Sequence, residues 1–169
     1  MTHELAARAD ADGALRWRVS VTDISRDGPF SMFPGYDRQT ALLAGAGCRI
    51  GSWVLSAADP LAGYGGDVPL ECVLTAGPAR VLNVFTARGR ASSRVAWSPV
   101  RGATVLGIAD RELVALCVDG DLVCAGVRLG RYDCARSDRP IACDGVGMVL
   151  LVTLDRNAFQ DSTRSTIPI

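Results

Sequence analysis

The chain has 169 residues, of which 49% are hydrophobic and 21% charged, as expected for one globular domain or for two small halves that share a core. Its 18 basic and 18 acidic residues cancel and no basic run occurs, which argues against a nucleic-acid partner and against a polybasic membrane contact. The chain contains no lysine, so a Schiff base and a lysine-containing phosphate loop are excluded, and any anion site must use arginine, backbone N–H groups or hydroxyls.

The first predicted elements are an extension and a strand. Residues 1–15 have mild helical propensity but end in Asp and Gly, and we leave them as an extension without an assigned structure. Segment 16–24 alternates Trp17, Val19 and Val21 with polar residues, and this period of two predicts a half-buried strand. Apolar runs bordered by Gly or Pro predict further strands at 40–45, 48–55, 69–75 and 79–86.

The second part of the chain shows the same pattern. Region 112–129 has two alternating runs on either side of Asp119-Gly120, a dipeptide typical of a tight hairpin turn. Segment 87–103 is the least structured part of the body, a last strand is expected at 147–155, and 156–169 form a polar tail. Short strands without helical periodicity predict an all-β sandwich or barrel.

The cysteine and histidine content limits the chemistry. The cysteines form no CxxC pair and no signal peptide precedes them, so we expect reduced, mostly buried thiols in a cytoplasmic protein, and no zinc site. No apolar run approaches the about 18 residues that a membrane span needs. His3 is the single histidine and lies in the N-terminal segment, so neither a Ser-His-Asp arrangement nor a histidine-rich metal site is expected. The cysteines are Cys48, Cys72, Cys117, Cys124, Cys134 and Cys143.

Three segments resemble the HutD/Ves family, namely 17–45, 65–84 and 130–136. The most specific part is "GPFSMFPGYDR" at 28–38, which is followed by "LLAG". The resemblance covers about residues 16–155 and therefore most of the chain.

The resemblance implies a bicupin fold, with two RmlC-like, jelly-roll cupin halves in one chain. A bicupin domain at 16–155 would have its halves at about 16–90 and 100–155. A weak echo of segment 41–50 in segment 115–124 agrees with two similar β halves.

The resemblance also implies a function. The HutD/Ves family takes its name from the histidine-utilisation operon, and its members are regarded as binding or regulatory proteins and not as established enzymes. The ligand would be a small pathway carboxylate of the urocanate or formylglutamate class, bound without a metal or cofactor in a regulatory or buffering role. A homodimer stays open. Two other functions stay open as well: a metal-independent isomerase or hydrolase that uses Asp67 or Tyr36 as acid/base, and a stress-related protein with a vestigial pocket.

Arg38 is the central candidate for the site. It matches the arginine that is thought to hold the ligand in the family, and a guanidinium can bind a carboxylate through two parallel hydrogen bonds. The alternative is a surface ion pair with Asp37, Asp27 or Asp67. Asp67 lies in a glycine-rich turn, where it would either anchor Arg38 or cap its own turn.

The remaining candidates surround this arginine in the sequence or by strand alternation. Phe30, Phe33 and Tyr36 would either wall a pocket for a flat ligand or fix the loop to the barrel. Ser31 would donate a hydrogen bond to a ligand oxygen. Asn83 alternates with apolar residues, so it would lie on an apolar face and would orient the ligand or the arginine, or satisfy buried backbone groups.

Overall fold

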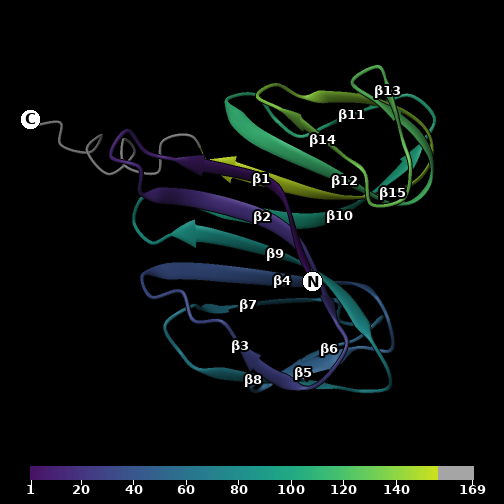
Figure 1. Cartoon of the computed structure of the whole chain (residues 1–169). Helices are drawn as coiled ribbons and strands as arrows, with labels where there is room; N and C mark the ends of the chain where they lie inside the picture. Colours follow the sequence, from purple (N-terminus) through teal and green to yellow (C-terminus); the bar gives the residue numbers. More distant parts are fainter. Residues whose placement is uncertain (156–169) are drawn as a thin grey trace, which may run out of the picture. The chain divides into compact units, whose positions relative to one another are not determined.

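The computed structural model describes residues 1–155, so the predicted tail at 156–169 lies outside the described residues. The described chain is all-β, as predicted, and contains no helix that is long and apolar enough to cross a membrane. It divides into two compact units, Met1–Arg88 and Gly89–Ile169, and the second is described up to Asp155 (Figure 1).

The first unit consists of two antiparallel sheets. One has the order β1-β2-β9-β4-β7 and the other has the order β3-β8-β5-β6. Figure 1 draws them as two layers, with β3, β8, β5 and β6 below β4 and β7. The strands are β1 (Thr2–Ala9), β2 (Leu15–Ile24), β3 (Gly28–Phe30), β4 (Tyr36–Ala44), β5 (Cys48–Ile50), β6 (Trp53–Leu55), β7 (Leu61–Gly65), β8 (Leu70–Leu74) and β9 (Ala79–Ala87).

The inner face of the larger sheet changes from apolar to polar along its strands. Alternate residues of a strand share a face. Along this face, each central strand has apolar side chains at one end and polar or aromatic side chains at the other. Register pairs Leu42 with Val81 and, two residues further along, Thr40 with Asn83. The apolar end packs against the smaller sheet in a cluster formed by Ile24, Leu42, Cys48, Ile50, Leu55, Ala62, Tyr64, Cys72, Ala79 and Val81.

The second unit has one sheet with the order β10-β15-β12-β13, to which β11 adds along β15 and β14 along β12. Its buried residues form a separate cluster that includes Leu113, Leu122, Ile141 and Val149. The strands are β10 (Ser93–Arg101), β11 (Thr104–Leu106), β12 (Arg111–Cys124), β13 (Val127–Leu129), β14 (Cys134–Ser137) and β15 (Ile141–Asp155).

Several elements differ from the sequence prediction. The segment left as an extension contains β1, which pairs with β2 from Thr2 to Ala9. The segment expected to be least structured, 87–103, contains β10, which pairs with β15 along its whole length. The strand expected at 48–55 is split into β5 and β6 by a turn at Gly51, where φ is +56°.

The prediction of a hairpin turn at Asp119-Gly120 is wrong. Strand β12 runs through this dipeptide, with a bulge after Cys117, and turns instead at 125–126. Gly120 lies opposite Gly147 of β15, and a Cβ atom on Gly147 would lie 2.3 Å from the Asp119 carbonyl oxygen. The glycine therefore permits a close approach of two long strands and does not end one of them.

The expectation that all six cysteines are reduced is also wrong. Cys124 and Cys143 form a disulfide, because the register of β12 and β15 places them opposite each other with their Cα atoms 4.2 Å apart. Sequence spacing gave no sign of this pair, since the register between two distant strands brings it together. The other cysteines are free thiols, of which Cys48, Cys72 and Cys117 are buried and Cys134 is half-buried.

Candidate functional site

A cavity of about 930 Å³ lies in the first unit, at the polar end of the inner sheet face. One wall is formed by side chains of β2, β4 and β9, and the other by β3 and the loop that follows it. Cys72 of β8 borders the cavity as well. The volume is within the range of small-molecule sites.

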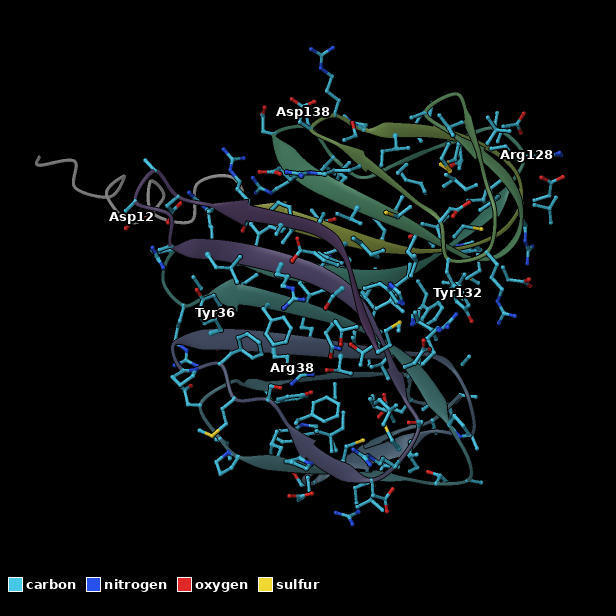
Figure 2. All side chains as sticks on the ribbon, in the orientation of Figure 1. Asp12, Tyr36, Arg38, Arg128, Tyr132 and Asp138 are labelled. Carbon is cyan, nitrogen blue, oxygen red and sulfur yellow. A yellow bond between two sulfur atoms is a disulfide. The ribbon has the colours of Figure 1, made fainter. Side chains whose placement is uncertain are left out.

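Arg38 projects from β4 into this cavity, between β4 and β3 (Figure 2). Only 6% of the residue is exposed. Its guanidinium carbon lies 4.2 Å from the ring centroid of Phe30, 4.8 Å from that of Phe85 and 5.7 Å from that of Tyr64. Burial lowers the pKa of Arg38, while Tyr64 and Cys72 oppose that change. The group remains charged, as arginine does in proteins.

Asn83 of β9 fixes the orientation of the guanidinium. Its Oδ1 accepts hydrogen bonds from Arg38 Nε at 3.2 Å, from Arg38 Nη2 at 2.8 Å and from the Thr40 hydroxyl at 2.9 Å. Its Nδ2 donates to Thr22 Oγ1 at 3.2 Å. The Thr40 hydroxyl is also within 2.6 Å of the Tyr64 hydroxyl. The expected role of Asn83 in orienting the arginine agrees with this network.

The hydrogen bonds leave one edge of Arg38 available. A guanidinium has five N–H groups, and here only the Nε–Nη2 edge is used, by Asn83. Among residues 1–155 the Nη1 atom has no hydrogen-bond acceptor, and no carboxylate lies within ion-pair distance of Arg38. The site therefore presents a fixed cationic fork that can take a planar anion.

The three acids considered as surface partners of Arg38 have other partners. Asp37 and Asp67 lie 3.0 Å and 2.7 Å from nitrogen atoms of Arg88. Asp27 accepts a backbone N–H from β8 at 2.8 Å. The surface ion pair is therefore not formed, and Arg38 belongs to the cavity.

The aromatic loop, residues 28–36, lines the cavity with some of its residues and is also fixed to the rest of the first unit. Phe30 covers one face of the guanidinium, and Phe33 packs on Phe85 with ring centroids 4.3 Å apart. Ser31 lines the cavity beside them. The loop is tied down where the Phe33 N–H donates to the Gly66 carbonyl at 2.8 Å. Only glycine suits position 66, since a Cβ there would lie 2.5 Å from the Phe33 oxygen.

Tyr36 and Asp67 are not among the residues that line the cavity. The Tyr36 hydroxyl donates to the Leu15 carbonyl at 2.7 Å. Asp67 accepts from the Gly35 N–H and from Arg88, both at 2.7 Å, and these bonds lower its pKa. A carboxyl group that acts as an acid near neutral pH needs a raised pKa, so the lowered pKa of Asp67 gives no support to an acid role for it, and neither residue borders the cavity.

The cavity also uses residues that the sequence reasoning did not single out. Arg18, Ser20 and Thr22 of β2 line it, and Arg18 Nε lies 3.0 Å from Glu4 Oε2. These residues are the polar positions of the alternating segment 16–24, for which the sequence predicts a half-buried strand with a solvent-facing polar side. Ser20 is in fact buried, so the polar face of this strand faces the cavity and not bulk solvent.

The residues around the cavity do not form a metal site of the usual cupin kind. Within residues 1–155 no group of three or more His, Cys, Asp or Glu side chains is placed to hold a metal ion. No histidine lines the cavity. The histidine-rich set that binds metals in many cupins does not fit the residues of this cavity.

Comparison with solved structures identifies the fold. HutD from Pseudomonas fluorescens SBW25, in a structure described as a formate condition, matches with a TM-score of 0.74 and 26% identity, over 91% of this chain and 87% of that one. A conserved protein of Pseudomonas aeruginosa PAO1 matches with a TM-score of 0.77 and 26% identity, over 91% and 88%. A cupin 2 conserved barrel domain protein from Leptotrichia buccalis, 9% identical over 91% and 86% of the two chains, matches in fold alone with a TM-score of 0.54.

The fold and the cavity thus define a class, the cupin-fold β proteins, here with an arginine in the cavity of the first unit. The chain belongs to the HutD family, whose model matches residues 1–151. A Pseudomonas putida protein named for the hutC 3' region is 32% identical over 152 residues, covering 82% of this chain and 78% of that protein. Protein Ves of Citrobacter koseri is 30% identical over 100 residues, covering 56% and 52%.

Proposed function

We propose that this protein binds a small organic carboxylate through Arg38 and acts as a sensor or buffer of that compound, without catalysing its conversion. The observation that carries the proposal is the buried guanidinium of Arg38, whose hydrogen-bond partner, the Asn83 amide, carries no charge. The Nη1–Nη2 edge is free among the described residues, and the cavity borders it. A carboxylate has the planar, two-oxygen geometry that this edge matches.

The energetics favour an anionic ligand. Burying an unpaired charge is costly, and here aromatic rings and one amide oxygen replace the water around Arg38. A ligand carboxylate would supply the missing opposite charge. A hydrogen bond to a charged group contributes about 1.5–3 kcal/mol, and two parallel bonds also fix the orientation of the ligand.

The setting we propose is histidine utilisation. Membership of the HutD family fits a protein associated with that pathway, and the Pseudomonas putida relative is named for the hutC 3' region. Its carboxylate intermediates, of the urocanate or formylglutamate class, are small enough for a cavity of about 930 Å³. Phe30 and Phe33 provide apolar walls for the part of the ligand beyond the carboxylate.

The test is thermal unfolding with urocanate, formylglutamate, formate and glutamate on wild type, Arg38→Gln and Arg49→Gln. At about 100 times its dissociation constant a ligand adds about 2.7 kcal/mol of stability. We expect a shift in wild type and in Arg49→Gln, because Arg49 is an exposed β5 residue outside the cavity lining. The shift should vanish in Arg38→Gln. Stabilisation that survives in Arg38→Gln would contradict the proposal, as would no response to any acid by a folded wild type.

A further inference from the structure

A pair of buried thiols lies beside the arginine. Cys48 of β5 and Cys72 of β8 are on adjacent strands, where register pairs Ile50 with Cys72 and Cys48 with Leu74. The two cysteines are therefore diagonal neighbours on one face of the smaller sheet. Cys48 is 0% and Cys72 1% exposed, and each thiol affects the ionisation of the other.

Only one of the two thiols reaches the cavity. Cys72 borders it together with Arg38, Phe30 and Phe85, whereas Cys48 is not among the lining residues. Cys72 and Arg38 also interact electrostatically, each affecting the ionisation of the other. A nucleophilic atom and an anion-binding cation thus border the same cavity.

The two thiols differ in how readily they ionise. The neighbouring Cys72 lowers the pKa of Cys48, whereas Cys48 and burial raise the pKa of Cys72 well above its usual range. The first proton lost from the pair therefore leaves Cys48. The positive charge of Arg38 opposes the rise at Cys72. Thiolates, and not thiols, are the nucleophiles of cysteine chemistry.

We propose that Cys72 is a covalent modification site for small carboxylic acids that carry an electrophilic carbon beside the carboxylate. Arg38 binds the carboxylate and so brings the reactive carbon to the thiol. The Cys72 sulfur forms a bond to that carbon while its proton passes to the Cys48 thiolate. The leaving group departs with the bonding electron pair. This inference rests on the proposed function, since it uses the same carboxylate-binding edge of Arg38.

The experiment compares two alkylating reagents that differ in charge, iodoacetate and iodoacetamide. Each reacts with the full chain, and peptide mapping by mass spectrometry gives the rate at Cys72. The ratio of the two rates is divided by that for a neutral model thiol, N-acetylcysteinamide. We expect this normalised ratio to be about tenfold or more in favour of iodoacetate, since 1.4 kcal/mol of charge-assisted binding is a tenfold factor.

One variant and one competitor complete the test. Arg38→Gln should return the normalised ratio to that of the model thiol. Acetate should protect wild-type Cys72 from iodoacetate, a readout that decides the matter even where Arg38→Gln fails to fold. A wild-type ratio equal to that of the model thiol, or no reaction at Cys72, would overturn the inference. If acids still stabilise wild type through Arg38 in that case, the carboxylate-binding function stands alone; if they do not, both fail.

Discussion

Asn83 decides which edge of Arg38 is available to a ligand. Its Oδ1 takes the Nε–Nη2 edge and also a hydrogen bond from Thr40, so the amide oxygen accepts more bonds than a neutral group usually does. An amide in this place orients the arginine without neutralising it. An acid in the same place would do both.

Asn83→Asp is therefore expected to weaken carboxylate binding while the protein stays folded. The new carboxylate would be 2.8 Å from Arg38 Nη2, and Thr22 could donate a hydrogen bond to the oxygen that replaces Nδ2. With its charge already paired, Arg38 should lose about tenfold or more in affinity for acids. Isothermal titration with the acid identified for wild type measures the change, and Thr22→Val serves as the control that leaves the charge at position 83 unaltered. Equal affinity in wild type and Asn83→Asp would argue against Arg38 as the binding group.

The individual site residues were predictable to different degrees. Arg38, Phe30, Phe33, Ser31 and Asn83 could be named from the sequence because they fall in one aromatic segment or break an apolar alternation, and all five line the cavity. Cys72 could not, since it reads as an ordinary buried residue of a strand. Strand register brings it to the arginine, and register cannot be read from local sequence.

A clamp of charged groups holds the loop between β3 and β4. Arg88 contacts Asp37 and Asp67 and also donates to the Tyr36 carbonyl at 3.2 Å. Asp67 in turn accepts the Gly35 N–H at 2.7 Å. These bonds are exposed, yet they act on the turn that places the cavity aromatics and Arg38. The element is thus fixed from outside the cavity that it lines.

The clamp predicts a pH dependence of the loop. The Gly35 N–H and Arg88 lower the pKa of Asp67 below its usual 3.8. Because the pKa of Asp67 is lower in the folded state, the charged carboxylate stabilises the clamp fully above the unfolded-state pKa of 3.8. This stabilisation is lost as the pH falls through the folded-state pKa. In wild type the Gly35 amide resonance should therefore titrate below pH 3.8, and in Asp67→Ala this step should disappear. Exchange of the Gly35 amide should be about tenfold faster in the variant, for one lost hydrogen bond.

The control for this prediction is Asp37→Ala. Asp37 contacts the same arginine, and no backbone N–H at the turn donates to it. Unchanged exchange at Gly35 in Asp67→Ala, or an equal effect of both variants, would show that Asp67 does not hold the turn.

Long strands with clear alternation were predictable, and short or polar ones were not. β2, β8 and β9 follow segments whose apolar period or Gly and Pro borders are plain in the sequence. β3, β11 and β13 have three residues each, too few to show a period. The sequence of β10 does not predict a strand, because the segment is rich in arginine and serine and contains Pro99. Pairing with β15 along its whole length holds it in the sheet.

The two units have different interiors, and this difference supports a ligand site in the first unit. The first has a cavity lined by charged, polar and aromatic side chains, whereas the buried cluster of the second consists of aliphatic residues and cysteines. Ligand binding should therefore depend on the first unit, and the cluster of the second should contribute stability. The disulfide between β12 and β15 belongs to that second cluster.

Reduction of the disulfide should destabilise the second unit and leave the cavity intact. Cys124 and Cys143 are 19 residues apart, and a cross-link that closes a loop of this length stabilises by about 3 kcal/mol through the lower entropy of the unfolded chain. We expect the double variant Cys124→Ser/Cys143→Ser, and wild type with a thiol reductant, to unfold at a lower temperature. Cys134→Ser, which alters a free thiol of the same unit, should change the unfolding temperature little.

The stabilisation by carboxylates should keep its size in all of these samples, because Arg38, Asn83 and the aromatic loop lie within Met1–Arg88. Loss of the ligand response on reduction would mean that the second unit takes part in the site, and an unchanged midpoint would mean that the bond contributes nothing to folding.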